Sequence, residues 1–161
     1  GIQPLLFGGG QERGLRPGTL ATHQIVGLGV ACDLAGTERE ADTKRIAQLR
    51  QQFWRGLMEI GGVELNGHPT ECIAGIINVA FHGIEGESLQ FGLRELAVSS
   101  GAACSSGSDE SSYVLRALGR SDQLAQSSLR FSLGRFTTGA EIDFALMVLS
   151  RELPRLRALV P

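Results

Sequence analysis

The sequence predicts an α/β module in which helices cover a small, mostly antiparallel β-sheet, with long helices early and late in the chain. An early helix is indicated by an apolar stripe at helical spacing: Ile46, Leu49, Phe53, Leu57 and Ile60. Strict alternation of apolar and polar residues over 128–133 is typical of a half-buried strand. A capping box over 138–141, followed by an apolar stripe over 142–156, predicts the late helix.

The first sixty residues are predicted to form a connector and two helices. Residues 1–18 are rich in glycine and proline and read as irregular chain. A helix over about 20–34 contains two glycines, which favour close packing and would place Cys32 in a core. A second helix over about 37–60 should end at Gly61-Gly62, because glycine commonly terminates a helix.

The rest of the chain alternates short strands and helices. Strands are expected over 63–65 and 75–81, then a helix over 87–96 and a strand over 97–100. Ser112 should cap a helix that ends at Gly119. The strand over 128–133 leads to the last helix, which Pro154 should kink or shorten.

Composition limits the class of protein. The 161 residues carry a formal net charge of −2, which gives no basic surface for DNA or other nucleic acid. No apolar run approaches the length of a membrane span, and the first residues lack the basic start of a signal peptide. Three widely spaced cysteines argue against a disulfide framework and for a reducing, cytoplasmic compartment. Their spacing also predicts no metal site.

Three positions are candidates for chemistry. Cys104 lies in a small, polar loop between a strand and a helix, where a thiol can react, although a chance cysteine in a surface loop fits equally well. Arg130 is turned away from the core by the strand alternation, and it either binds a carboxylate through two parallel hydrogen bonds or forms a surface ion pair. Thr19 follows a glycine- and arginine-containing segment that suits an anionic group or is simply an exposed basic loop.

Three runs of sequence carry a family resemblance: GGGQERGLRPGT at 8–19, VSSGAACSSGSDESSYVLRALG at 98–119, and SSLRFSLGRFTT at 127–138. They resemble the carboxy-terminal part of NifS/IscS-type group I cysteine desulfurases, which use pyridoxal phosphate. The resemblance implies the small domain of a fold-type I transferase, with residues 1–18 as the connector from a large domain and 19–161 as the small domain carrying a cysteine loop at 98–112. It also implies that Cys104 receives sulfur as a persulfide and that Arg130 binds the carboxylate of L-cysteine. Thr19 would reach the cofactor phosphate of the second subunit in a homodimer.

The large domain that carries the cofactor lysine in such enzymes has no counterpart among these residues. Lys44 is the only lysine, and it lies on the polar side of a predicted helix, whereas covalent cofactor binding needs a desolvated lysine. The chain alone is therefore expected to be inactive. Completed by the lysine domain, it would release alanine and pass sulfur to an acceptor, such as a scaffold protein, for iron–sulfur clusters or tRNA thiolation. The alternatives are a selenocysteine lyase-like enzyme and a non-catalytic module that pairs with another chain or binds sulfur carriers.

Overall fold

The structure is a computed structural model that describes residues 1–100 and 111–159. Its chain divides into two compact units, Gly1–Glu40 and Ala41–Pro161. The first unit contains a 3-10 helix, η1 (Gln11–Gly14), and the beginning of helix α1 (Thr22–Ile60). The second contains the remainder of α1, then β1 (Val63–Asn66), β2 (Ile76–Phe81), α2 (Gly86–Gly92), β3 (Ser99–Ser100), α3 (Tyr113–Ala117), α4 (Asp122–Gln126), β4 (Ser128–Ser132) and α5 (Gly139–Arg157).

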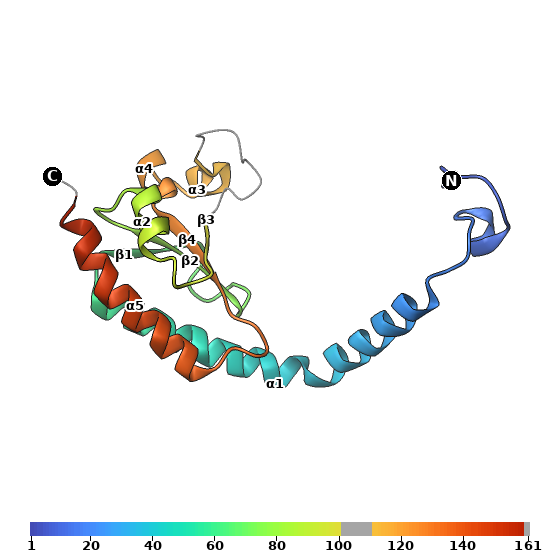
Figure 1. Cartoon of the computed structure of the whole chain (residues 1–161), viewed down its shortest axis with the longest axis horizontal. Coiled ribbons are helices and arrows are strands. Elements are labelled where there is room, and N and C mark those ends of the chain that lie inside the picture. The colour runs from blue at the N-terminus through green and yellow to red at the C-terminus, as the bar shows by residue number, and fades with distance from the viewer. Residues whose placement is uncertain (101–110, 160–161) are drawn as a thin grey trace. The chain divides into compact units, whose positions relative to one another are not determined.

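The four strands form one sheet in the order β1-β2-β4-β3, and every neighbouring pair is antiparallel. The last strand in sequence, β4, is thus inserted between β2 and β3. The second part of α1 and α5 run side by side beneath one face of this sheet (Figure 1). The predicted fold class, a small antiparallel sheet covered by helices, is confirmed.

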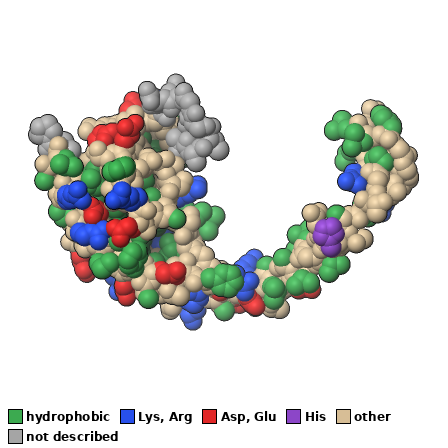
Figure 2. All heavy atoms as spheres, viewed as in Figure 1, with side chains coloured by type: hydrophobic (Ala, Val, Ile, Leu, Met, Phe, Trp, Pro, Cys, Tyr) green, Lys and Arg blue, Asp and Glu red, His purple; other side chains and the backbone are tan. Residues whose placement is uncertain are grey.

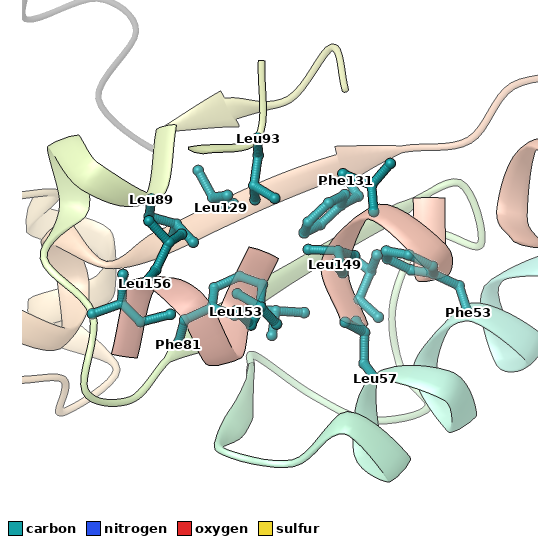
Figure 3. Close-up of a cluster of buried hydrophobic side chains, with 14 of the residues drawn as sticks. Phe53, Leu57, Phe81, Leu89, Leu93, Leu129, Phe131, Leu149, Leu153 and Leu156 are labelled. Carbon is teal, nitrogen blue, oxygen red and sulfur yellow. The ribbon is translucent and has the colours of Figure 1, made fainter. Parts of the chain in front are cut away.

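The core lies between that face of the sheet and the two long helices. Leu129 and Phe131 of β4 meet Leu149 and Leu153 of α5 there (Figure 3). The rings of Phe53 and Phe131 are 4.9 Å apart between centroids and tilted by 60°. The core members predicted from the two helical stripes and from the β4 alternation are buried or packed against this cluster.

Helix α1 differs from the prediction, because the two expected helices form one helix of 39 residues. Thr37, where a second helix was expected to begin, does not act as a cap. Its hydroxyl instead donates back to the carbonyls of Asp33 and Leu34, each at 3.1 Å, which leaves the helix uninterrupted. The predicted end at Gly61 is confirmed, and both Gly61 and Gly62 adopt positive φ angles of 77° and 61°.

The prediction that Cys32 lies in a core is wrong. Cys32 is exposed, as is every residue over 21–37. Its apolar neighbours on α1 include Ile25, Val26, Leu28 and Val30, each more than half exposed. Figure 2 shows hydrophobic side chains along the first part of α1. The spacing of apolar residues correctly predicts a helix here. It does not predict whether another element of the same unit covers that helix.

Two further details of the helices depart from the prediction. Ser112 occupies the N-cap position of α3, but its side chain makes no capping hydrogen bond. Of the two effects predicted for Pro154, a kink or a shorter helix, the second is wrong, because α5 continues to Arg157. Proline removes a single N–H, and the helix is completed beyond it because the N–H of Ala158 donates to the Pro154 carbonyl at 3.1 Å.

The capping box that begins α5 forms as predicted. The N–H of Thr138 donates to Glu141 Oε2 at 2.8 Å, and the N–H of Glu141 donates to Thr138 Oγ1 at 3.3 Å. Hydrogen bonds from Thr138 hold the pKa of the Glu141 carboxyl below its usual range. None of the helices in the described part of the chain has the length and apolar character needed to cross a membrane.

Candidate functional site

A row of polar residues crosses the face of the sheet that is turned away from the core. The strand register places Asn66 of β1 opposite Asn78 of β2, Asn78 opposite Arg130 of β4, and Arg130 opposite Ser99 of β3. One residue from each strand thus contributes to the row, and Arg130 lies on the strand with neighbours on both sides. Cross-strand partners of this kind bring their Cβ atoms to within about 5 Å.

Arg130 is the predicted site residue that the structure places most clearly. Leu129 and Phe131 on either side of it are buried, at 0% and 7% exposure, so the pleat turns Arg130 to the other face, where it is exposed. Within residues 1–100 and 111–159 no hydrogen bond or ion pair engages its guanidinium. The five N–H donors of Arg130 are therefore available to a ligand from outside this part of the chain.

Arg120 organises the other end of the row. Its Nε donates to Asn66 Oδ1 at 2.6 Å and its Nη2 donates to the carbonyl of Leu65 at 2.8 Å. Its Nη1 donates to the carboxylate of Glu64. These three bonds attach the chain just beyond α3 to β1.

The carboxylate of Glu64 is shared by two basic side chains. The hydrogen bond from Arg120 is the main cause that lowers the pKa of Glu64, and His82 adds to it with its Nε2 at 3.4 Å from Oε2. Glu64 therefore stays ionised over the neutral and mildly acidic range, and its charge is matched by Arg120.

Cys104, the predicted nucleophile, lies outside the described residues. The segments that flank it are described. Before the loop, β3 pairs with β4, and Ser99 lies opposite Arg130. After the loop, the hydroxyl of Ser111 donates to the carboxylate of Asp122 at the start of α4, the helix that leads into β4. Both flanks are therefore attached to the part of the fold that presents Arg130.

Thr19, the predicted phosphate contact, is an exposed residue of the unit Gly1–Glu40. The segment before it is held by local bonds: the N–H of Gly18 donates to Gln11 Oε1 at 3.1 Å, and Arg16 Nη1 donates to the carbonyl of Pro17 at 3.1 Å. Glu12 and Arg13 have φ angles of 50° and 58°. A non-glycine residue in this left-handed region costs about 1–2 kcal/mol, so the turn before Thr19 is strained.

No residue of the chain fits covalent binding of pyridoxal phosphate. The only lysine, Lys44, is exposed on α1, as the sequence predicted. A lysine that forms a Schiff base needs a desolvated position, and an exposed helix face does not supply one.

Sequence reasoning missed Asn66, Asn78 and Arg120. Asn66 follows the strand expected over 63–65, whereas in the structure it is the last residue of β1 and is only 9% exposed. The signal that could have found Asn78 is its place as the single polar residue of the strand 76–81, between Ile77 and Val79. Arg120 had no signal, because its contact with β1 spans more than fifty residues.

Comparison with known proteins decides the family. Residues 2–144 match the class-V aminotransferases. The chain belongs to this family. As a class-V aminotransferase it is 53% identical over 160 residues to the cysteine desulfurase IscS of Acinetobacter baumannii strain AYE, and that match covers 99% of this chain and 40% of the relative. The chain therefore spans about 40% of the length of the curated relatives that it matches.

Solved structures of similar proteins agree with this assignment. A NifS-like protein superimposes with a TM-score of 0.81 at 32% identity, covering 96% of this class-V aminotransferase chain and 40% of its own. The structure of SspA in complex with cysteine gives a TM-score of 0.57 at 29% identity over 85% of this chain and 37% of its own. These findings confirm the family resemblance and the fold class expected from the sequence.

Proposed function

We propose that this chain is the small-domain part of a cysteine desulfurase. The observation that carries the proposal is the 53% identity to IscS over nearly the whole chain. It is combined with an exposed arginine, Arg130, on the face of the sheet that is turned away from the core. The assignment of residues 1–18 as a connector and 19–161 as the small domain is part of the same proposal. We call the chain together with the lysine-bearing part of its relatives the completed enzyme.

Class-V aminotransferases of the IscS and NifS type depend on pyridoxal phosphate, which supplies the electron sink for chemistry at the substrate amino acid. The exposed Lys44 does not fit that cofactor, so the covalent attachment belongs to the rest of the completed enzyme. The isolated chain is then inactive. Thr19 contributes its hydroxyl to the cofactor phosphate across a homodimer in this proposal, and the completed enzyme works in the cytoplasm.

Arg130 binds the α-carboxylate of L-cysteine in the proposed enzyme. A guanidinium holds a carboxylate through two parallel hydrogen bonds, which fixes the orientation of the substrate as well as its charge. The exposure of Arg130 and its freedom from described partners support this role. The structural neighbour SspA was solved in complex with cysteine, which supports the choice of ligand.

Cys104 accepts the sulfur. Its thiol takes the sulfur atom of L-cysteine to become a persulfide, while the carbon–sulfur bond of the substrate breaks and a proton completes alanine. One cysteine and one thiol thus give one alanine and one persulfide, with no external oxidant or reductant. A thiolate is the side chain suited to this attack, because it is far more nucleophilic toward sulfur than a hydroxyl. The persulfide then passes to an acceptor protein.

Arg130→Lys in the completed enzyme tests the substrate site. A lysine keeps the positive charge but cannot form the two parallel hydrogen bonds of a guanidinium. We therefore expect kcat/KM for L-cysteine to fall about ten- to a hundredfold, mainly through a higher KM. The matched control is Arg94→Lys, because Arg94 is exposed on the chain just beyond α2, where its guanidinium stacks 5.6 Å from the ring centroid of Phe91. Unchanged kinetics in Arg130→Lys would remove Arg130 from the substrate site.

A further inference from the structure

The hydrogen bonds around Asn66 fix the orientation of two amide groups. Arg120 can only donate, so the Asn66 atom that meets its Nε at 2.6 Å must be the amide oxygen. The amide nitrogen of Asn66 is then the donor on the other side. It donates to Asn78 Oδ1 at 2.7 Å and to Ser128 Oγ at 3.0 Å.

The orientation of Asn78 follows from that of Asn66. Its oxygen is turned toward β1, because that oxygen accepts the bond from Asn66. The amide nitrogen of Asn78 is left with two N–H donors, and it makes no hydrogen bond to any of the described residues. Asn78 is partly buried, and on the side away from β1 its neighbour across the sheet is Arg130.

Two adjoining residues therefore present donors without acceptors among the described residues. Arg130 adds a positive charge, and the carboxylate of β1 on the same face, Glu64, is already engaged by Arg120 and His82. A planar anion with two oxygens matches this arrangement, because each oxygen of a carboxylate accepts more than one hydrogen bond. A carboxylate that accepts two hydrogen bonds from the Arg130 guanidinium can therefore accept further hydrogen bonds.

We infer that the Asn78 amide nitrogen donates a hydrogen bond to the carboxylate held by Arg130, making Asn78 a second recognition residue for an α-carboxylate. This inference rests on the proposed function, which supplies the amino-acid substrate. Arg120 is the positioning residue, since it acts through Asn66 and does not touch the ligand. Asn78 thereby favours L-cysteine over thiols that lack a carboxylate.

Competitive inhibition of the completed enzyme separates recognition of the carboxylate from general damage. The two inhibitors are 3-mercaptopropionate, which has a carboxylate and a thiol, and cysteamine, which has an amine and a thiol. In Asn78→Ala we expect the inhibition constant of 3-mercaptopropionate and the KM of L-cysteine to rise about ten- to a hundredfold, the effect of losing one hydrogen bond to a charged group. The inhibition constant of cysteamine should change less than about twofold.

Asn78→Asp is the second variant, because aspartate has the same shape and still accepts the bond from Asn66. It replaces the free amide nitrogen with a carboxylate oxygen, which repels the carboxylate of the inhibitor. Asn78→Asp should therefore weaken the binding of 3-mercaptopropionate more than Asn78→Ala does. Ser132→Ala is the control, since Ser132 is exposed on β4 two residues from Arg130, and it should leave both inhibitors unchanged.

Arg120→Met tests the positioning role against Arg116→Met, a change at an exposed arginine of α3. Arg120→Met releases the Asn66 amide, so the inhibition constant of 3-mercaptopropionate divided by that of cysteamine should rise several-fold. The same ratio should not change in Arg116→Met. A purely structural role for Arg120 would lower stability and leave that ratio unchanged.

The outcomes separate the inference from the proposed function. Equal losses for both inhibitors in Asn78→Ala, or no loss for either, would overturn the inference. A large penalty in Arg130→Lys with none in either Asn78 variant would also overturn it, while the proposed function stood. If Arg130→Lys itself had no effect, the proposed substrate site would be wrong.

Discussion

Replacing Phe131 with leucine should destabilise the unit Ala41–Pro161 without changing any residue on the face of the sheet that is turned away from the core. Phe131 lies on the core side of β4, directly after Arg130, and is 7% exposed. Its ring centroid is 4.9 Å from that of Phe53 and 6.4 Å from that of Phe81, and both pairs are tilted by 60°. Leucine fills much of the same volume but forms neither aromatic contact.

The magnitude follows from those two contacts. Each tilted aromatic pair contributes about 0.5–1.5 kcal/mol beyond the area it buries, so Phe131→Leu should lower the free energy of unfolding by about 1–3 kcal/mol. Phe131→Ala also leaves a cavity and should lower it by about 3–5 kcal/mol. The coupling energy between Phe53→Leu and Phe131→Leu should be about 0.5–1.5 kcal/mol, because the double variant loses their shared contact only once.

Urea unfolding of the 161-residue chain gives these energies. Its single tryptophan, Trp54, packs against the core next to Phe53 and reports the loss of that core by fluorescence. Phe136→Leu is the matched control, since Phe136 is 84% exposed, and it should change stability by less than about 0.5 kcal/mol. A coupling energy of zero, or equal losses in Phe131→Leu and Phe136→Leu, would refute the packing described for β4.

Three further changes test other parts of the fold. Gly75→Ala should destabilise the chain by about 1–3 kcal/mol in urea unfolding, because the new Cβ would lie 2.6 Å from the carbonyl oxygen of Leu133, just after β4. The control Gly134→Ala meets nothing within 4 Å and should be nearly neutral. Thr138→Ala should lower stability by about 1 kcal/mol by removing the cap of α5, and thermal unfolding measures it; a neutral result would contradict the capping box. Because the folded-state pKa of Glu64 is lowered, its contribution is complete above the unfolded pKa of glutamate and is lost as the pH falls through the folded value. The difference in unfolding free energy between the wild type and Glu64→Gln should therefore be largest near neutral pH and shrink in acid, and a difference that grows in acid would contradict the ion pair.

Local patterns in the sequence predicted most of the second unit. The β4 alternation, the stripe of α5 and its capping box depend on neighbours within a few residues, and all three appear in the structure. The continuity of α1 was missed because the Thr37 hydroxyl bonds to the preceding carbonyls instead of capping a new helix, and the two arrangements look the same in sequence. The exposure of Cys32 was missed because an apolar helix does not encode what covers it.

The candidate site was only partly predictable for a related reason. Arg130 could be placed on the face turned away from the core from its own strand, since the alternation of apolar and polar residues is a local property. Its neighbours Asn78 and Ser99 come from strands that the sequence did not order, because β4 is inserted between two strands that precede it. Arg120 acts across the sheet edge on β1, and only the folded chain brings those residues together.

The central claim is that Cys104 accepts sulfur, and peptide mass analysis of the completed enzyme tests it most directly. Cys32 and Cys72 are both exposed, so exposure alone would not single out Cys104 from its competitors. After incubation with L-cysteine, the peptide that contains Cys104 should gain the mass of one sulfur atom, and those with Cys32 or Cys72 should not. Cys104→Ser should still bind L-cysteine but release no alanine. Persulfide on Cys32 or Cys72, or full activity in Cys104→Ser, would contradict the account.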